Sequence, residues 1–438
     1  MIQAIRIPAG SIDLNMSTDE MPFRWRSVAL PAFLPTLLFS IGEGAIIPII
    51  PLVADGLGAT IAVAGLVAGA LTVGELVGNI PSGWLVSRIG ERPAMIGASL
   101  LSIVGLSICM LAPSPFWLAL GVFIVGLATA TFALARHAFM TSFVPIRYRA
   151  RALSTLGGTF RAGAFVGPFI AAAVIQLTGL AQSAFTIHVI ACLGAALVLA
   201  FLRDPTTTFG AAASARKTDR QLPRTEKSLE PRETRGLFGT INDNRGVLAR
   251  LGLGAALIGA MRASRMVILP LWALSIGIPD ATTALIIGIA GGVDFALFYV
   301  SGQVMDRFGR LASALPSMIG LGVGHLALSL THDLPTAVGW FIACALFLAL
   351  ANGLGSGILM TLGSDLADRG NPAPFLGAWR FTSGLGTAGA PLLLAGVTAV
   401  GSIALAAGVM GALGLFGAGI LRRYVPRYVP RRPRFPRG

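Results

Sequence analysis

Long apolar blocks recur from one end of this chain to the other, and they constrain its fold more than any other feature. The blocks run for eighteen to twenty-seven residues, and turn-rich or charged breaks separate them. About 20 apolar residues in a helix cross a hydrocarbon core of about 30 Å. Charged residues make up 12% of the chain, against about 25% in a soluble domain. The sequence therefore predicts an all-α membrane protein with twelve transmembrane helices.

A polar segment divides the predicted helices into two sets of six. The first set is expected at 28–52, 62–84, 94–111, 116–140, 153–177 and 182–202, and the second at 247–273, 281–305, 312–330, 336–362, 375–399 and 401–421. The chain then consists of an N-terminal segment (1–27), an N-terminal six-helix bundle (28–202), a linker (203–246), a C-terminal six-helix bundle (247–421) and a tail (422–438). The linker is poor in apolar residues, which is typical of a flexible connection. The tail is basic and rich in proline, which predicts a non-helical conformation from Arg423 onward.

Basic residues alternate between the two ends of the predicted helices. Outside the helices, Lys and Arg lie in the terminal segments, the linker and every second loop, and the other loops carry none. Basic residues near helix ends are retained on the cytoplasmic side. Both termini and the linker are therefore expected in the cytoplasm. The strong preference for Arg over Lys suggests a bacterial source of high GC content, and hence the bacterial inner membrane.

The basic charge of the chain does not predict nucleic-acid binding. The net charge of +14 comes from residues between apolar blocks, whereas a nucleic-acid-binding domain carries a basic face on a soluble fold. Cys109, Cys192 and Cys344 lie singly in apolar stretches, so neither a disulfide framework nor a zinc site is expected. No phosphate-binding loop or H-E-x-x-H motif occurs. We therefore expect no metal or other cofactor, and a membrane-embedded enzyme is the less favoured alternative.

An offset of 219 residues aligns the second half of the chain with the first. The matched positions include Pro51 with Pro270, Ser82 with Ser301, Gly83 with Gly302, Arg88 with Arg307, Gly90 with Gly309, Gly158 with Gly377 and Arg161 with Arg380. The offset also places Glu75 on Asp294, and rare intramembrane charges seldom match by chance. Internal repeats of this kind build many multi-helix membrane folds. Because each half has an even number of spans, we expect two pseudo-twofold-related six-helix bundles with the same orientation.

Two loops at equivalent places in the halves carry one motif. The loop after the second predicted helix reads G-W-L-V-S-R-I-G-E-R from Gly83, and the loop after the eighth reads G-Q-V-M-D-R-F-G-R from Gly302. Both resemble the G-x-x-x-D-R-x-G-R signature of the major facilitator superfamily. The first copy has Ser87 in place of the acid and Glu91 in place of the final base. The resemblance implies a gating motif made of Gly83, Arg88, Gly90, Gly302, Asp306, Arg307, Gly309 and Arg310. The second copy is expected to form a cytoplasmic gate with three arginines at the start of the fifth helix, Arg147, Arg149 and Arg151.

Two helices resemble those of the family's twelve-helix drug-efflux antiporters. The first helix contains G-x5-P-x2-P from Gly42 to Pro51, which is similar to their first-helix motif. The fifth contains Gly163, Gly167 and Pro168 in a pattern similar to their antiporter motif G-x-x-x-G-P-x-x-G-G, with alanines in place of the last two glycines. Small residues also allow close packing in any membrane protein, so a plain helix interface is an equal alternative.

The fourth predicted helix departs from the efflux group. Efflux members tend to carry R-x-x-Q-G there, and this chain has Val122 and Val125 before Gly126, so the arginine often linked to proton transfer is absent. The resemblance as a whole implies a secondary active transporter that works by alternating access as a monomer in the lipid bilayer. Its motifs favour proton-coupled efflux of a small hydrophobic, amphipathic or anionic compound over uptake of a small metabolite by a symporter.

Eight charged residues lie within predicted helices, where a charge costs about 2.5 to 3.5 kcal/mol on insertion scales and usually faces a cavity or a partner. Seven are expected to line a cavity for the substrate or the coupling proton: Glu43, Glu75, Asp294, Arg161, Arg262, Arg265 and Arg380. The eighth, Arg136, is expected to snorkel to the membrane surface.

Glu43 is the predicted carrier of the coupling proton. The 219-residue offset places it on Arg262, so the two are expected to approach each other across the pseudo-twofold axis, with Arg262 or Arg265 as the partner. A permanent ion pair that locks the halves together is the alternative. The aligned pair Arg161 and Arg380 suits an anionic substrate, because arginine binds carboxylates through two parallel hydrogen bonds. The same two arginines could instead neutralise the two aligned acids.

Overall fold

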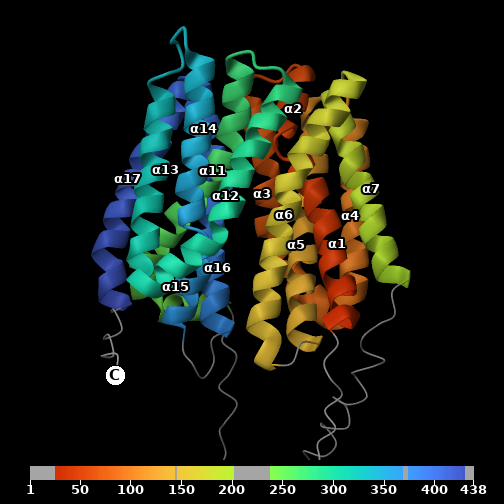
Figure 1. The fold of residues 1–438 in the computed structure, drawn as a ribbon, viewed down its shortest axis with the longest axis vertical. Coiled ribbons are helices and arrows are strands. Elements are labelled where there is room, and N and C mark those ends of the chain that lie inside the picture. The colour runs from red at the N-terminus through yellow and green to blue at the C-terminus, as the bar shows by residue number, and fades with distance from the viewer. Residues whose placement is uncertain (1–24, 144–145, 202–236, 368–372, 430–438) are drawn as a thin grey trace, which may run out of the picture.

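Helices lie side by side in two halves, each built from one half of the chain (Figure 1). The computed structural model describes residues 25–143, 146–201, 237–367 and 373–429, and no strand occurs in these ranges. The N-half contains α1 (Trp25–Ile46), α2 (Ile50–Gly56), α3 (Ile61–Ile89), α4 (Glu91–Met110), α5 (Pro115–Phe143), α6 (Ile146–Thr178), the 3₁₀ turn η1 (Ala181–Ser183) and α7 (Ala184–Phe201). The C-half contains α9 (Leu237–Asp243), α10 (Arg245–Val247), the π-helical turn η2 (Leu248–Gly252), α11 (Leu253–Ser275), α12 (Asp280–Phe308), α13 (Arg310–Ser329), α14 (Ala337–Leu354), α15 (Ile358–Leu366), α16 (Ala373–Val400) and α17 (Ile403–Tyr428).

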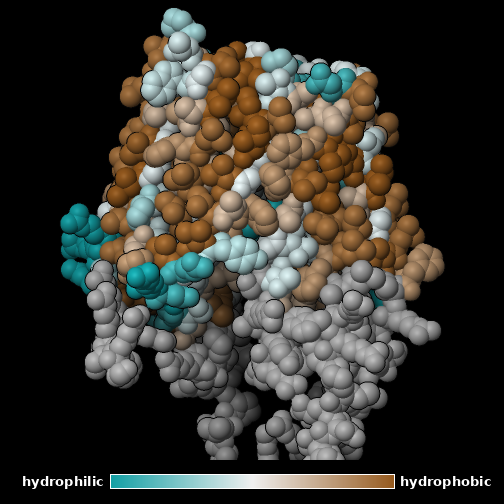
Figure 2. All heavy atoms as spheres, in the orientation of Figure 1, coloured by the Kyte–Doolittle hydropathy of each residue, from teal (hydrophilic) through white to brown (hydrophobic). Residues whose placement is uncertain are grey.

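The predicted twelve-helix membrane fold is confirmed. In the described part of the chain, eleven helical segments are long and apolar enough to cross a membrane, and α1 with α2 adds a twelfth span that is bent by 41°. Figure 2 shows hydrophobic residues over most of the visible face, with hydrophilic residues gathered near the two ends. Large apolar side chains such as Leu177 and Phe201 are more than four-fifths exposed, as expected where lipid covers the surface.

Two spans that the sequence predicts as continuous, 28–52 and 336–362, are interrupted. Between α1 and α2 lies Pro48, which has no N–H to donate to the helix. Between α14 and α15 lie residues 355–357, where Gly357 has a φ of +79°, a left-handed conformation that glycine adopts at little cost. Interrupted helices of this kind leave backbone carbonyls free to accept hydrogen bonds from side chains.

The backbone follows the 219-residue repeat. Gly58 and Gly277, which are related by the offset, both have positive φ angles, of +84° and +73°. Gly90 and Gly309 are related in the same way, with φ angles of +87° and +92°. Gly90 lies between α3 and α4, and Gly309 lies between α12 and α13, at the turns that carry the shared loop motif.

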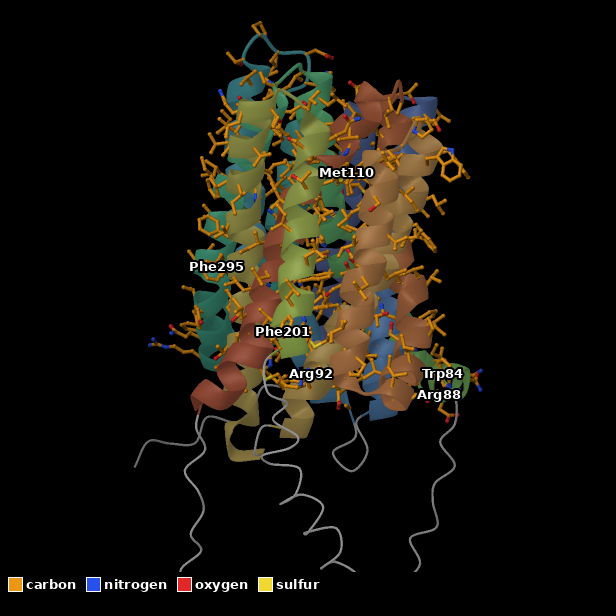
Figure 3. All side chains as sticks on the ribbon, turned by 90° about the vertical axis from the view of Figure 1, so that its right-hand side faces the viewer. Trp84, Arg88, Arg92, Met110, Phe201 and Phe295 are labelled. Carbon is orange, nitrogen blue, oxygen red and sulfur yellow. The ribbon has the colours of Figure 1, made fainter. Side chains whose placement is uncertain are left out.

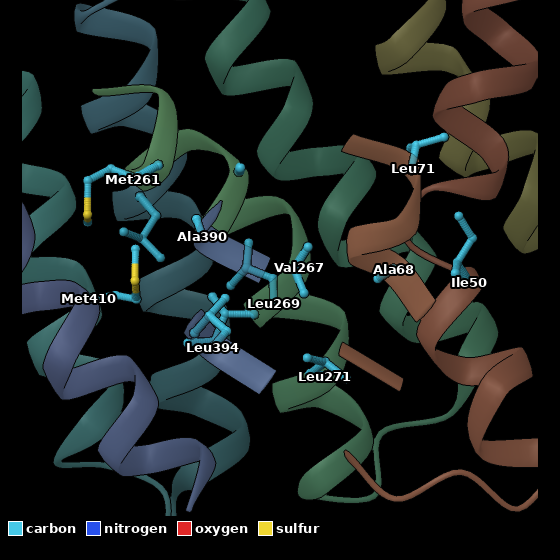
Figure 4. Close-up of a cluster of buried hydrophobic side chains, with 14 of the residues drawn as sticks. Ile50, Ala68, Leu71, Met261, Val267, Leu269, Leu271, Ala390, Leu394 and Met410 are labelled. Carbon is cyan, nitrogen blue, oxygen red and sulfur yellow. The ribbon is translucent and has the colours of Figure 1, made fainter. Parts of the chain in front are cut away.

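The halves meet at the end of the molecule that holds α2 and the start of α3, here called the far end. An apolar cluster there joins Ile50 and Leu71 of the N-half to Leu271 and Leu394 of the C-half (Figure 4). A Cβ added at Gly69 would lie 2.7 Å from Pro391 of the C-half, which shows how closely the helices approach. The second core cluster lies toward the opposite end, where α1 begins and α17 ends, and all its members belong to the N-half. This opposite end is here called the terminal end.

Aromatic and basic side chains lie together near the terminal end. Figure 3 shows Trp84, Arg88 and Arg92 there, with Met110 toward the far end. Trp84 is 60% exposed, and the Arg88 guanidinium lies 5.2 Å from the centroid of its ring. Tryptophan and arginine are typical of the boundary between hydrocarbon and water, so this level marks a membrane surface.

Two expectations about connecting segments are wrong for the residues that the structure describes. The tail is helical as far as Tyr428, because α17 continues through Pro426, whose missing donor matters little near a helix end. Val425 is buried there, and Arg250 donates a hydrogen bond to the Tyr428 hydroxyl at 3.0 Å, so contacts with the bundle stabilise this last turn. Within the predicted flexible linker, residues 237–243 form helix α9. The remainder of the tail and of the linker lies outside the described residues.

Candidate functional site

Charged side chains inside the molecule gather in two clusters. The N-cluster consists of Glu43 on α1, Glu75 on α3 and Arg136 on α5. The C-cluster consists of Arg262 and Arg265 on α11, Asp294 on α12, Asn352 on α14 and, from the N-half, Arg161 on α6. Six of the seven residues expected to line a cavity therefore fall in one of these clusters.

Glu43 is the most buried member of the N-cluster. Only 5% of the residue is exposed, and its Oε2 atom has no hydrogen-bond partner. Arg136 and Glu75 interact with it electrostatically. The Arg136 guanidinium lies 4.6 Å from the centroid of the Phe160 ring, and its Nε atom is buried. The expectation that Arg136 snorkels to the surface is wrong, because its guanidinium turns inward to an aromatic face and a buried acid.

Asp294 links the members of the C-cluster. Its Oδ2 atom accepts hydrogen bonds from Arg265 Nη2 at 3.2 Å and from Asn352 Nδ2 at 2.7 Å. Its Oδ1 atom lies 3.6 Å from Arg161 Nη1, and the Arg161 guanidinium also lies 4.7 Å from the centroid of the Phe298 ring. Because Arg161 belongs to the N-half and Asp294 to the C-half, this ion pair connects the two halves.

Arg262 binds the backbone at the break between α14 and α15. Its Nη2 atom donates to the Gly355 carbonyl at 2.6 Å, and that carbonyl, just past the end of α14, also accepts a hydrogen bond from the Ile358 backbone N–H at 3.2 Å. The repeat aligns Glu43 with Arg262 and Arg136 with Gly355, so the same two positions meet in both halves. The expected approach of Glu43 to Arg262 or Arg265 is not seen in this structure, because each arginine has its partner within the C-half.

Arg380 lies apart from both clusters. It is exposed on α16, yet it interacts electrostatically with His137 on α5 of the other half. The Arg161 side chain, which also lies between the halves, is 25% exposed. Both arginines are therefore partly accessible to solvent where the two halves approach each other.

The second copy of the gating motif forms a charge network. Arg310 donates from Nε to Asp365 Oδ2 at 2.7 Å and from Nη1 to Asp306 Oδ1 at 3.2 Å. The Asp306 side chain is 82% exposed. The Arg307 guanidinium lies over the ring of the next residue, at 5.3 Å from its centroid. The side chains of the three arginines expected to complete the gate lie outside the described residues.

The first copy of the motif, in which the acid is replaced, makes a different contact. Arg88 lies over the exposed Trp84 ring, as described above. Gly83 and Gly302 occupy equivalent positions nearly two turns before the ends of α3 and α12, and a Cβ at Gly302 would meet nothing within 4 Å. The motif glycines with a defined structural task are therefore Gly90 and Gly309, at the positive-φ turns.

The antiporter-like motif forms the contact between α6 and α1. A Cβ at Gly163 would lie 1.9 Å from a side-chain oxygen of α1, and one at Gly167 would lie 2.3 Å from a backbone oxygen of α1. Pro168 is buried next to them within α6. In the C-half, Gly386 aligns with Gly167, and a Cβ there would lie 1.9 Å from a backbone oxygen of α11. This geometry favours the helix-interface alternative, because both halves use the same close contact.

Three partners in these networks were not singled out from the sequence. Arg136 was assigned to the membrane surface, and Asn352 and Asp365 were not considered. A sequence signal for Asn352 exists, since it is a lone amide in an apolar predicted helix, where polar side chains usually have a partner. Asp365 lies just beyond the tenth predicted helix, and nothing in its local sequence pairs it with the motif.

Neither cluster has the composition of a metal site. Guanidinium groups only donate hydrogen bonds. Across the described ranges, no three His, Cys, Asp or Glu side chains come together, and the three cysteines are free and buried. The chemistry available is therefore ion pairing, hydrogen bonding and proton binding by carboxylates.

Known proteins with similar sequences are transporters. The sequence profile of the Major Facilitator Superfamily matches residues 32–391. Multidrug resistance protein MdtH of Aeromonas hydrophila is 26% identical over 357 residues, which cover 81% of this chain and 83% of that protein. Probable inositol transporter 2 of Arabidopsis thaliana is 29% identical over 106 residues, and the gallate transporter of Pseudomonas putida is 31% identical over 131 residues. The chain aligns with only 18% and 28% of the lengths of the latter two proteins.

Solved structures show the same fold. A D-xylose-proton symporter superposes with a TM-score of 0.71 at 14% sequence identity, over 93% of this chain and 99% of that one. A POT family transporter in complex with 5-aminolevulinic acid superposes with a TM-score of 0.70 at 12% identity, over 92% and 97% of the two chains. The family profile covers most of the chain, and the fold and the relatives agree with it. The chain therefore belongs to the Major Facilitator Superfamily, whose members are membrane transporters and not enzymes.

Proposed function

We propose that this chain is a proton-coupled secondary transporter that works by alternating access, with the N-cluster as its proton-binding site. The charge of the N-cluster supports this, since Glu43 interacts both with the guanidinium of Arg136 and with a second carboxylate, Glu75. With both acids ionised the cluster is negative, and one bound proton makes it neutral. A charge at the membrane centre costs about 2.5 to 3.5 kcal/mol on insertion scales, so proton binding offsets an appreciable cost. Glu43 is the proposed carrier, because its Oε2 atom is buried without a partner.

Efflux across the bacterial inner membrane is the proposed direction. It is supported by the alignment with MdtH over 81% of this chain and by the efflux-like pattern from Gly42 to Pro51. A small hydrophobic, amphipathic or anionic compound is the proposed cargo, and the proposed working form is a monomer in the lipid bilayer with both termini in the cytoplasm. Uptake by symport is the second candidate, supported by the partial alignments with inositol and gallate transporters.

Transport by the full chain in liposomes tests the proton site. Ethidium and gallate serve as cargo probes, with and without an imposed pH gradient. Glu43→Gln should abolish movement driven by the gradient while exchange of cargo for cargo persists, since exchange needs the conformational change but no net proton. Asp333→Asn is the matched control, because that acid is 96% exposed and outside both clusters.

Two outcomes decide where the proton binds. If Glu43→Gln retains full gradient-driven transport and Glu75→Gln loses it, the carrier is Glu75. If both variants retain it, the N-cluster is a structural ion network and the proton binds elsewhere.

A further inference from the structure

The C-cluster carries more positive charge than its own acid can balance. Three guanidinium groups, those of Arg161, Arg262 and Arg265, interact electrostatically with one another, and in the described ranges Asp294 is the one carboxylate among them. Arginine stays protonated in proteins. Like charges held together inside a membrane are unfavourable unless an anion compensates them. The cluster therefore has an excess of two positive charges that a bound anion would reduce.

Hydrogen-bond donors in the C-cluster are also left without partners. The Nε atoms of Arg262 and Arg265 are buried and have no hydrogen-bond partner. Only 7% of Arg265 is exposed, so water has little access to its donors. Asp294 already receives its closest bonds from Arg265 and Asn352, and its contact with Arg161 is the longest of the three. A buried donor without an acceptor is unfavourable, so these groups favour a ligand that accepts hydrogen bonds.

Arg161 is the member of the cluster best placed to meet a ligand. Its side chain is 25% exposed, the largest exposure in the cluster's ion pairs, and the Phe298 ring lies against its guanidinium. Phe165 stacks on Phe295 beside this pair, between α6 and α12. A ligand held by Arg161 would therefore have its charge on a guanidinium and its apolar body near aromatic rings, a combination that suits an aromatic carboxylate.

The N-cluster has no such excess of positive charge. At the two positions where the C-half has Arg262 and Gly355, the N-half has Glu43 and Arg136, an acid and a base. The repeat thus gives one half a site that gains by binding a proton and the other half a site that gains by binding an anion.

We propose that the C-cluster is the binding site for the cargo, and that the cargo is an organic anion with a carboxylate group and an apolar or aromatic body. The identification of this anion as cargo rests on the proposed transport function, whereas its binding does not depend on proton coupling. The carboxylate accepts hydrogen bonds from Arg161 and Arg262. It competes with Asp294 for Arg161, so its arrival loosens the ion pair that connects the halves.

Equilibrium binding to the purified full chain in detergent, at one pH and without a gradient, tests this assignment. The probe is benzoate, and its uncharged amide, benzamide, is the control ligand, followed by calorimetry and by thermal unfolding. Benzoate should bind and raise the unfolding temperature, and benzamide should do neither. Arg161→Gln and Arg262→Lys should each weaken benzoate binding at least about tenfold, which corresponds to about 1.4 kcal/mol. Arg423→Gln, at an exposed arginine on α17 outside both clusters and the gating motif, should leave binding unchanged.

Several outcomes would overturn the assignment. Equal binding of benzoate and benzamide would mean that charge is not recognised. Unchanged benzoate affinity in both Arg161→Gln and Arg262→Lys would place the anion elsewhere, and absence of benzoate binding to the unmodified chain would remove the aromatic carboxylate as the cargo class. Arg262→Lys keeps the charge and so guards against a folding defect, because Arg262 also binds the Gly355 carbonyl. None of these results depends on proton coupling. Loss of charge-selective benzoate binding together with intact gradient-driven ethidium transport would therefore contradict the proposed cargo class and leave the proposed transport function standing.

Discussion

Asp294 has two arginine partners whose geometry differs, and double-mutant cycles can measure that difference. Arg265 Nη2 lies 3.2 Å from the carboxylate with 9% of its side chain exposed, whereas Arg161 Nη1 lies 3.6 Å away with 25% exposed. Removing one partner of a buried pair costs about 3–5 kcal/mol, while solvent-exposed pairs contribute about 0–1 kcal/mol. We expect a coupling energy of about 2–3 kcal/mol between Asp294→Asn and Arg265→Gln. Between Asp294→Asn and Arg161→Gln we expect less than about 1 kcal/mol.

The free energy of unfolding can be followed by titration with a denaturing detergent in mixed micelles. A thiol-reactive dye is a suitable probe, because Cys109, Cys192 and Cys344 are free and buried and become reactive only when the chain opens. The same variants should be compared at one pH, so that protonation of the carboxylate does not enter the cycle. Equal coupling energies for the two arginines, or a larger one for Arg161, would refute the reasoning that burial decides which partner is structural. The weaker pair would then no longer qualify as the contact that opens between the halves.

Three further expectations concern topology, packing and gating. A periplasm-active reporter fused after Ser114 should be active and one fused after Lys217 inactive, because basic residues hold their segments in the cytoplasm; activity at Lys217 would reverse the orientation. Gly386→Ala should destabilise the chain by about 1–3 kcal/mol through overpacking, because its Cβ would lie 1.9 Å from a backbone oxygen, whereas Gly389→Ala on the same helix, with nothing within 4 Å, should be neutral or stabilising. Equal unfolding temperatures would contradict the close contact of α16 with α11. Asp306→Asn should slow transport yet cost less than about 0.5 kcal/mol of stability, since its carboxylate is 82% exposed; unchanged transport kinetics would leave the motif a packing role only.

The two clusters show how one repeat can give two chemistries. The duplicated backbone brings position 43 to position 136 in one half and position 262 to position 355 in the other. In the N-half these positions hold Glu43 and Arg136, and in the C-half they hold Arg262 and Gly355. With glycine at a helix break in the place of the base, Arg262 binds a backbone carbonyl, and the acid that interacts with it, Asp294, is shared with Arg161 and Arg265.

The sequence by itself determined the elements and their duplication. Each predicted span is present because a block of about 20 apolar residues can satisfy its backbone in lipid only as a helix. The 219-residue offset located the equivalent turns, and Gly90 and Gly309 indeed share a positive φ that few other residues adopt. The intramembrane charges were also visible in advance, because a charge in an apolar block is costly and therefore conspicuous.

Only the tertiary structure decided which charges meet. The offset states which positions are equivalent, and equivalence across an axis is not contact: Glu43 was expected near Arg262 and lies near Arg136 instead. Partner choice depends on how each helix is rotated about its axis and on where it breaks, and neither follows from a pattern of apolar residues. The break between α14 and α15 placed the Gly355 carbonyl within reach of Arg262, and the packing of α6 on α12 brought Arg161 to Asp294. These contacts join residues far apart in the chain, so their energies depend on distances and burial that only the folded arrangement fixes.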